Sequence, residues 1–322
     1  MDLRPLVTDD IPAWAALLAA TEKVDATGEH FTEADLAEEM ANPEVEVGKD
    51  FLGAWDDGEL VGYVSVLPRG EAEGVYKVHV EGTVRPDRRG ENIGTELAAA
   101  MVERGVAAGR ARAGALPVRL MTTGLSRNEA QADLLAGVGL RGERWNFVMR
   151  TSLDDLPPVL PLADGYAFLP YDEVPPAAVH RAHNAAFDGH HPNFTPWTEA
   201  SWAQWVTGSH SFRPDVSAVV VPEGATDVVG YVTTHEFTGY QEATGRREAY
   251  VGKVGVLEEH RGRGLAGALL THCLRRYAEA GYDEASLDVD SANPTGALGV
   301  YERAGFAVES RWTNYFRTVP PA

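Results

Sequence analysis

Residues 256–266 read V-L-E-E-H-R-G-R-G-L-A, and they are the strongest indication of architecture in the chain. A β-like segment at 249–256 leads into them, and an amphipathic helix-like pattern follows. Glycines let the backbone approach a ligand closely, and the first N–H groups of a helix are free to bind an anion. The arginines of the stretch add positive charge and paired hydrogen-bond donors. We therefore expect a strand, a pyrophosphate-binding turn and a helix.

The helix after this turn shows two apolar rows at i, i+4 spacing. One row is Leu265, Leu269, Cys273 and Tyr277, and the adjacent row is Ala266, Leu270, Leu274 and Ala278. The pattern ends near Gly281, and glycine is typical just after a helix end. Because Cys273 lies within an apolar row, we interpret it as a packing residue and not as a nucleophile.

The turn has a counterpart in the first half of the chain. Residues 84–94 read V-R-P-D-R-R-G-E-N-I-G, after a strand-like segment at 75–84. Downstream, Gly139 and Gly305 each precede an aromatic, strand-like stretch. The two turns lie 172 positions apart and the two glycines 166 positions apart. A nearly constant offset indicates a duplicated unit.

The duplication and the length of 322 residues predict two domains. A segment at 155–165, rich in proline and turn-forming residues, suits a linker between them. We therefore expect one domain at 1–154 and a second at 155–322. Within each half the expected order is strand, helices, three or so strands, helix, strand, helix and strand, which predicts an α/β fold with a mixed sheet.

Composition restricts the kinds of partner and site. The chain has 28 Lys and Arg against 48 Asp and Glu, and the net charge of −20 disfavours nucleic acid and membrane surfaces while favouring cationic solutes. One cysteine, and no signal-peptide pattern near Met1, predict a cytoplasmic protein. Four histidines lie among aromatic residues without a cysteine nearby, so we expect packing and no metal site. They are His180, His183, His190 and His191.

The second turn and the sequence after it resemble the acetyl-CoA-binding region of the GCN5-related N-acetyltransferase (GNAT) family. That family has R/Q-x-x-G-x-G/A at the turn, which Arg261, Gly264 and Ala266 match. The resemblance continues through Leu287-Asp288-Val289-Asp290, Asn293, Ala297, Tyr301 and Gly305-Phe306. It covers approximately residues 165–318, and a weaker copy covers residues 1–150, so the chain is similar to a tandem GNAT protein.

This resemblance implies where acetyl-CoA binds. In the family the strand before the turn separates from its neighbour, and its backbone bonds the pantetheine arm; here those positions are Val254, Gly255 and Val256. The residues that would hold the pyrophosphate are Arg261, Gly262, Arg263, Gly264, Leu265, Ala266 and Gly267. Asn293, Ala297 and Tyr301 would face the far side of the pantetheine.

Acetyl transfer to an amine needs a base for the ammonium and a proton for the departing thiolate. Tyr301 matches the family's tyrosine and is the expected acid, and the N–H of Val254 is expected to stabilise the oxyanion. Glu248 and Glu236 are the candidate bases, acting directly or through water. Tandem members that acetylate an amino-sugar with a cysteinyl thiol have a substrate-binding glutamate upstream of this strand. Alignment from the strand start assigns that place to Glu248, and alignment from its end assigns it to Tyr250.

The first half departs from the pattern. Arg89 and Gly94 match the turn, but Asn92 replaces the central glycine, and Leu135 stands where the second half has Tyr301. A side chain in the turn hinders approach to a pyrophosphate, and leucine cannot donate a proton. We therefore expect the first half to keep the fold without transferring acetyl groups.

The sequence thus predicts an acetyl-CoA-dependent N-acetyltransferase that acts by direct attack on a primary amine of a small, cationic acceptor. Two other acceptors stay open: an amino-sugar precursor with a cysteinyl thiol, and a protein N-terminus or lysine. The alternative of another class is a CoA-binding sensor or scaffold without turnover.

Overall fold

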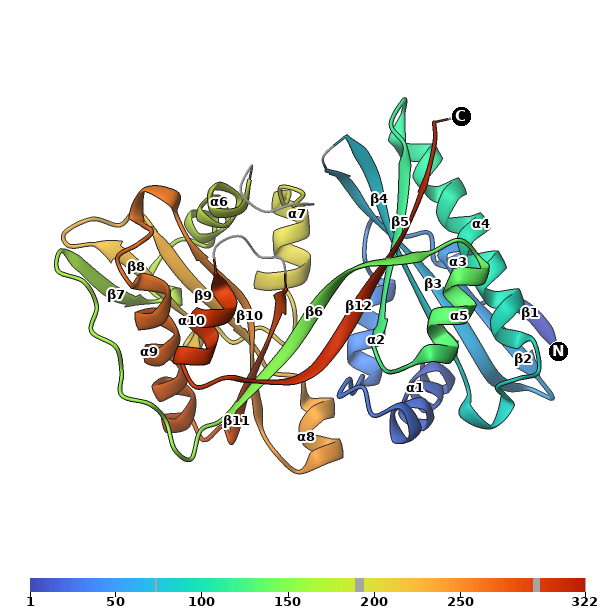
Figure 1. Ribbon diagram of the computed structural model, residues 1–322, viewed down its shortest axis with the longest axis horizontal. Coiled ribbons are helices and arrows are strands. Elements are labelled where there is room, and N and C mark those ends of the chain that lie inside the picture. Colours follow the sequence, from blue (N-terminus) through green and yellow to red (C-terminus); the bar gives the residue numbers. More distant parts are fainter. Residues whose placement is uncertain (73, 189–193, 292–295, 322) are drawn as a thin grey trace. The chain divides into compact units, whose positions relative to one another are not determined.

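The computed structural model describes residues 1–72, 74–188, 194–291 and 296–321 (Figure 1). The chain forms two compact units. The first consists of Met1–Trp145 and Trp312–Ala322, and the second consists of Asn146–Arg311. Each unit contains strands of a mixed sheet and the helices that pack on them, which confirms the predicted α/β fold.

In the first unit the strand order is β1-β2-β3-β4-β5-β12. β4 and β5 run parallel, and the other neighbouring strands run antiparallel. The elements are β1 (Asp2–Pro5), α1 (Ile11–Asp25), α2 (Glu33–Met40), α3 (Val47–Asp50), β2 (Phe51–Asp56), β3 (Glu59–Ala72), β4 (Val75–Val84), α4 (Ile93–Ala113), β5 (Val118–Leu125), α5 (Glu129–Gly137) and part of β12 (Ala307–Val319).

In the second unit the strand order is β6-β11-β10-β9-β8-β7. β10 and β11 run parallel, and the other neighbours run antiparallel. The elements are part of β6 (Arg141–Ser152), β7 (Tyr166–Pro170), α6 (Pro176–Phe187), α7 (Glu199–Trp202), β8 (Ala218–Pro222), β9 (Gly230–His235), α8 (Thr238–Thr244), β10 (Glu248–Val256), α9 (Leu265–Glu279), β11 (Glu284–Asp290) and α10 (Ala297–Arg303).

The two halves of the sequence exchange their closing strands. Residues 146–152 of β6 pair with β11 in the second unit. Conversely, residues 312–319 of β12 pair with β5 in the first unit. The expected division at residue 155 follows the repeat in the sequence, whereas the compact units follow the pairing of the strands.

The second unit has a hydrophobic core on each face of its strands. On one face α9 packs over β9, β10 and β11, and all four residues of its first apolar row are at most 2% exposed. The predicted amphipathic helix is therefore confirmed, and Cys273 is a packing residue whose thiol pKa burial raises to about 12. On the other face α6 and α7 cover β8 and β9, with Trp202 and Tyr231 in the core (Figure 1).

Candidate active site

β10 and β11 separate along their length. Parallel pairing joins Glu248–Tyr250 to Glu284–Ser286 and then stops. Beyond this point β10 stays paired with β9 as far as Val256, and β11 stays paired with β6 as far as Asp290. The edges that β10 and β11 turn toward each other therefore carry backbone groups without a ladder partner. Val254, Gly255 and Val256 lie in this separated part, as the family resemblance implies for a pantetheine site.

A β-bulge lies where the separation begins. Val251 pairs with Thr234 and Lys253 with Thr233, so Gly252 is the extra residue. A bulge leaves its residue unpaired and increases the local twist of the strand. A Cβ on Gly252 would lie 2.7 Å from Cδ2 of His235, so a side chain does not fit there. We did not predict this bulge, although a glycine inside a strand is the signal that indicates one.

The turn between β10 and α9 is open. Gly262 and Gly264 have φ angles of +75° and +77°, in the left-handed region. A Cβ on either would meet no heavy atom within 4 Å. Gly264 is the N-cap of α9 and provides no capping side chain, so the first N–H groups of Leu265, Ala266 and Gly267 remain for a ligand. This geometry suits an anion.

The two turn arginines differ in what they contact. Nε of Arg261 donates to the carbonyl oxygen of Val256 at 3.1 Å, and its Nη2 donates to that of Ala186 at 2.7 Å. Arg261 therefore ties the turn to the end of β10 and to α6. Arg263 is exposed, and its contact with the carbonyl oxygen of Glu259 is long, at 3.4 Å. Arg263 is thus the more accessible of the two cations.

Gly255 is constrained by its neighbour on β9. A Cβ there would lie 2.5 to 2.7 Å from the ring and hydroxyl of Tyr231. That hydroxyl lies 2.6 Å from Nδ1 of His183, which is 4% exposed. Burial lowers the pKa of His183 to about 2, so the imidazole is neutral.

Aromatic packing is the role of the described histidines in this region. The ring of His183 contacts those of Phe187, Phe194, Trp197 and Trp202, and His180 stacks on Trp202. The expected packing therefore holds for His180 and His183. His190 and His191 lie outside the described residues.

Tyr301 lies on the short helix α10, which also contains Ala297 and contacts α9. Its side chain packs against the same hydrophobic core as Val254 and Val256, so the predicted acid and the predicted cofactor strand border one core. Burial raises the pKa of the Tyr301 phenol to about 12, and its hydroxyl bonds no described residue. A phenol with this pKa keeps its proton at neutral pH. The predicted Asn293 lies outside the described residues.

Glu236 is enclosed by hydrogen-bond donors. Arg213 donates to it at 2.8 Å, Tyr282 at 2.9 Å, and Arg247 through two nitrogens. Burial alone would raise the pKa of this carboxyl, but the hydrogen bonds lower it to about 2. A carboxylate with so low a pKa is a weak base at neutral pH. This geometry favours a structural ion pair for Glu236.

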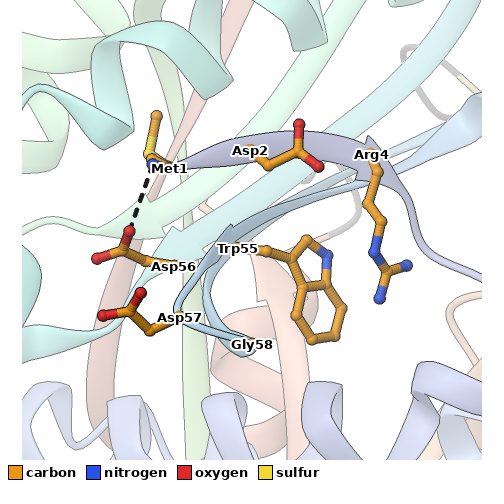
Figure 2. A pocket seen from close by; sticks show the side chains of 7 residues that line it. All are labelled: Met1, Asp2, Arg4, Trp55, Asp56, Asp57 and Gly58. Atoms are coloured by element: carbon orange, nitrogen blue, oxygen red, sulfur yellow. Dashed lines mark ion pairs between the residues drawn. The ribbon is translucent and has the colours of Figure 1, made fainter.

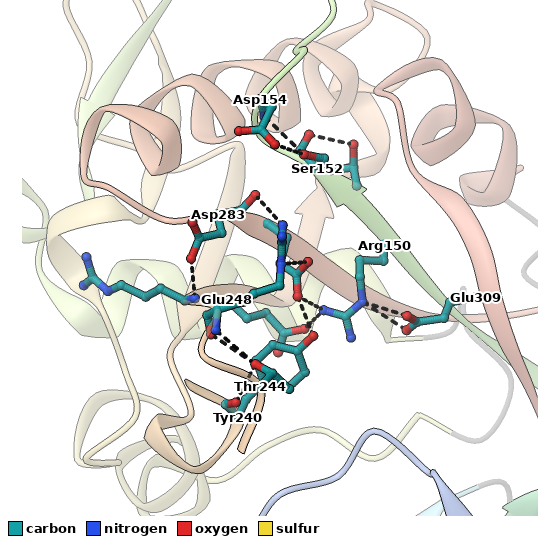
Figure 3. Close-up of polar contacts among 12 residues, drawn as sticks. Arg150, Ser152, Asp154, Tyr240, Thr244, Glu248, Asp283 and Glu309 are labelled. Atoms are coloured by element: carbon teal, nitrogen blue, oxygen red, sulfur yellow. Dashed lines mark hydrogen bonds and ion pairs between the residues drawn. The ribbon is translucent and has the colours of Figure 1, made fainter. Parts of the chain in front are cut away.

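Glu248 lies at the closed end of the strand pair, opposite Glu284. Nη1 of Arg150 bonds both carboxylates, and its Nε bonds Glu309 at 3.0 Å (Figure 3). Burial raises the pKa of Glu248, and Arg150 opposes that rise. We did not predict Arg150, because it belongs to the closing strand of the other half and no local pattern distinguishes it.

A polar pair lies where β10 and β11 part. The hydroxyl of Tyr250, the last residue of β10 that pairs with β11, donates to Oδ2 of Asp288 at 2.7 Å. Asp288 is exposed, and it lies on the face of β11 opposite the core that contains Leu287 and Val289. Alignment from the strand start assigns the substrate-binding position to Glu248, and alignment from the strand end assigns it to Tyr250. In the structure, Glu248 is buried in an ion pair, whereas Tyr250 bonds the carboxylate of Asp288.

The first half keeps the strand separation but differs at its turn. β4 pairs with β5 only from Tyr76 to His79, and β5 continues along β12. Arg89 bonds both carboxylate oxygens of Asp25 at 2.7 Å, so the charge of the turn arginine is balanced within the protein. Asn92 adopts a φ of +66°, and Leu135 is buried in the core. No phenol thus takes the place that Tyr301 has in the second half.

Other features of the described residues do not add to this site. A surface pocket of about 460 Å³ lies at the amino-terminal end of β1 (Figure 2). It is lined by Met1, Asp2, Arg4, Trp55, Asp56, Asp57 and Gly58, and its three aspartates disfavour a phosphate. Within the described ranges, no group of three or more His, Cys, Asp or Glu residues is arranged to hold a metal ion. Nor does that part of the chain contain a helix that is long and apolar enough to cross a membrane.

Comparison with known proteins identifies the class. The model of the acetyltransferase (GNAT) family matches residues 15–123 and 177–306, which is more than half of the chain. The chain therefore belongs to the GNAT family, and it is an acetyl-CoA-dependent acetyltransferase with two GNAT regions. The predicted family, tandem organisation, enzyme class and cosubstrate are confirmed.

Similar proteins extend over nearly the whole chain. Mycothiol acetyltransferase of Mycolicibacterium vanbaalenii is 34% identical over 267 residues, or 80% of this chain and 79% of that protein. A GCN5-related N-acetyltransferase from Sphaerobacter thermophilus has a TM-score of 0.79 at 26% identity, over 100% of this chain and 96% of its own. A tandem GNAT protein from the clavulanic acid biosynthesis pathway has a TM-score of 0.70 at 19% identity, over 100% and 99% of the two chains, and shows the same fold.

Proposed function

We propose that the second half, residues 155–322, transfers the acetyl group of acetyl-CoA to a primary amine of a small, cationic acceptor by direct attack. The observation that carries this proposal is the combination of an open turn at Gly262 and Gly264 with a Tyr301 hydroxyl that bonds no described residue. In the first half, Asn92 and Leu135 occupy the corresponding places.

The cofactor would lie between the separated parts of β10 and β11. In this arrangement the backbone of Val254, Gly255 and Val256 bonds the pantetheine arm, and the start of α9 with Arg263 binds the pyrophosphate. The N–H of Val254 donates to the developing oxyanion, which lowers the barrier because the donor is already in place. Tyr301 gives its proton to the departing thiolate.

Glu248 is the better supported base of the two glutamates. Its pKa is raised by burial, whereas that of Glu236 is lowered to about 2. Because Glu248 lies in the paired part of β10, before the strands separate, it would take the ammonium proton through a water molecule.

Asp288 would attract the acceptor. Asp288 lies where the strands part, and its residue is exposed. Burial raises the pKa of its carboxyl, and the hydrogen bond from Tyr250 opposes that rise. A carboxylate in this position favours an acceptor with a positive charge. The chain's net charge of −20 favours the same class of solute.

A second candidate acceptor is the mycothiol precursor, an amino-sugar compound with a cysteinyl thiol. It is favoured by the 34% identity to a mycothiol acetyltransferase over most of both chains. If the mycothiol precursor is the acceptor, the steps of acetyl transfer are the same as for a small cationic amine.

The test is acetyl transfer to a panel of amines: polyamines, aminoglycosides, simple amino-sugars and the mycothiol precursor. Products are identified by mass spectrometry, because a thiol on the acceptor interferes with colorimetric detection of CoA. We expect Asp288→Asn to raise KM for the cationic acceptor about tenfold with little change in KM for acetyl-CoA. Binding of acetyl-CoA without product from any amine would favour a sensor and contradict the proposal.

A further inference from the structure

Two nearly buried carboxylates face each other at the closed end of the cofactor strands. Glu248 on β10 and Glu284 on β11 are register partners, and the side chain of each is 8% exposed. Neighbouring strands lie only about 4.8 Å apart, and like charges directly opposite each other destabilise strand pairing. Without a cation between them, the two carboxylates would force the strands apart or take up a proton.

Arg150 supplies that cation from a third strand. It pairs in register with Ser286 of β11, and its guanidinium extends across β11 to Glu248 on β10. Nη1 bonds Glu284 at 2.9 Å as well as Glu248, and Nε bonds Glu309 of β12 at 3.0 Å (Figure 3). One planar guanidinium therefore joins carboxylates of three strands, which a lysine ammonium cannot reproduce with the same geometry.

The position of this contact is significant because the strand pairing ends two residues later. Glu248↔Glu284 is the first register pair of β10 and β11, and Tyr250↔Ser286 is the last. Whatever holds the first pair together also determines where the two strands begin to diverge. Beyond Tyr250 and Ser286, no ladder hydrogen bonds join β10 to β11. Backbone pairing therefore does not fix the distance between the two strands there.

We propose that Arg150 is a positioning residue for acetyl transfer: it holds β10 against β11 at the closed end, and so determines the opening that receives the pantetheine arm and the place of Glu248. This inference rests on the proposed function. Arg150 precedes Glu248 by 98 residues and comes from the first half of the sequence. Because the closing strands are exchanged, the second unit contains a residue from the first half of the sequence.

The charges predict how substitutions differ. Without Arg150, Glu284 keeps Arg246 at 2.7 Å, whereas Glu248 loses its arginine. Arg150→Gln therefore leaves one carboxylate unbalanced next to the other. Replacing Glu248 by glutamine in the same chain removes that repulsion, so the double variant should regain most of the lost affinity for CoA. Arg150→Lys keeps a charge but cannot bond three carboxylates, so its effect should be intermediate.

The experiment measures the Kd of CoA for the full chain by calorimetry, well below the melting temperature of each variant. We expect Arg150→Gln to bind about tenfold more weakly, Arg150→Lys about threefold more weakly, and Arg150→Gln with Glu248→Gln within about twofold of wild type. The matched control is Arg104→Gln, which removes the arginine from another buried carboxylate, Asp50, at 2.7 Å in the first unit. That variant should lose stability while CoA binding stays unchanged.

Hydrogen exchange gives a second measurement that needs neither CoA nor an acceptor. The amides of 248–250 and 284–286 should exchange faster in Arg150→Gln than in wild type, and in Arg104→Gln they should not. A folded Arg150→Gln variant with wild-type CoA affinity and exchange would overturn the inference. If Arg150→Gln does not fold, wild-type values in Arg150→Lys would overturn it equally. If the wild-type chain binds CoA but acetylates no amine, the proposed function is wrong. The CoA affinities and exchange rates of the Arg150 variants still test whether Arg150 holds β10 against β11.

Discussion

The hydroxyl of Tyr301 is the group most directly suited to protonate a thiolate. We predict that Tyr301→Phe lowers kcat by about 10- to 1000-fold, because the departing thiolate loses its acid. The affinity for acetyl-CoA should change little, since the ring still packs in the core. Steady-state kinetics and calorimetry measure the two effects separately.

Tyr171 provides a matched control. Its phenol is buried, and burial raises its pKa to about 12, as for Tyr301. It packs in the core on the α6 face, away from β11. Tyr171→Phe should therefore leave kcat unchanged, and an equal loss in both variants would show that Tyr301 acts through packing alone.

Glu236 should contribute stability that depends on pH. Its pKa in the folded protein is about 2, below the ordinary 4.5, so the contribution is complete above pH 4.5 and is lost as the pH falls toward 2. After a discount for solvent screening, the shift corresponds to roughly 1–2 kcal/mol at neutral pH. We predict that Glu236→Gln is destabilised by about this amount at pH 7, and that the difference from wild type shrinks in acid.

Urea denaturation between pH 3 and pH 7 measures this prediction, with the exposed Glu242→Gln as the control. A constant difference across that range would mean that Glu236 stabilises by packing and not by charge. The role of Glu236 could not be predicted from the sequence. Arg213 and Arg247 lie 23 and 11 residues away from it. The antiparallel pairing of β9 and β10 brings Arg247 close, and the bond from the Arg213 backbone N–H to the carbonyl oxygen of Thr234 brings Arg213 close.

Gly264, in the turn before α9, has two possible roles: it adopts a positive φ, and it leaves the helix start uncovered for a ligand. An alanine at Gly264 would be strained by its positive φ, at a cost of roughly 1–2 kcal/mol. Asparagine tolerates this conformation, and Asn92 adopts it in the first half with a φ of +66°. We predict that Gly264→Asn keeps the stability of wild type but binds CoA about tenfold more weakly, because a side chain now covers the helix start.

Calorimetry and thermal unfolding of the same variant test this directly. Loss of stability together with affinity would assign the glycine a purely conformational role. Wild-type affinity would mean that the pyrophosphate lies elsewhere.

Local patterns predicted the individual elements well and the relations between them poorly. The strand at 75–84 and the helix starting at Leu265 follow from alternation and i, i+4 spacing, which are properties of a single segment. The bulge at Gly252 and the helix α8 were not predicted, because a bulge depends on register and a single short helix leaves little periodicity. The exchange of β6 and β12 depends on contacts between distant segments, so no pattern within either half indicates it.

The duplicated chain should bind a single acetyl-CoA. Both halves keep separated parallel strands, so strand geometry alone would allow two sites. At the turn the halves differ: Arg89 is bonded through two nitrogens to Asp25, whereas Arg261 at the equivalent position donates to the carbonyl oxygen of Ala186. The exposed Arg263 stands where the first half has Glu91. A carboxylate at a pyrophosphate site both neutralises the arginine and repels the ligand.

We therefore predict a stoichiometry of one CoA per chain by calorimetry. Arg89→Gln should leave both stoichiometry and affinity unchanged, because the guanidinium is already held by Asp25 and by the carbonyl oxygen of Val84. Arg263→Gln, in the open turn of the second half, should weaken the one observed site about tenfold by removing a charged donor to phosphate. Two equivalents bound to wild type, with one lost in Arg89→Gln, would instead mean that the ion pair opens to admit the ligand. Both turns would then be cofactor sites, and only the absence of a tyrosine at Leu135 would distinguish the first half from the second.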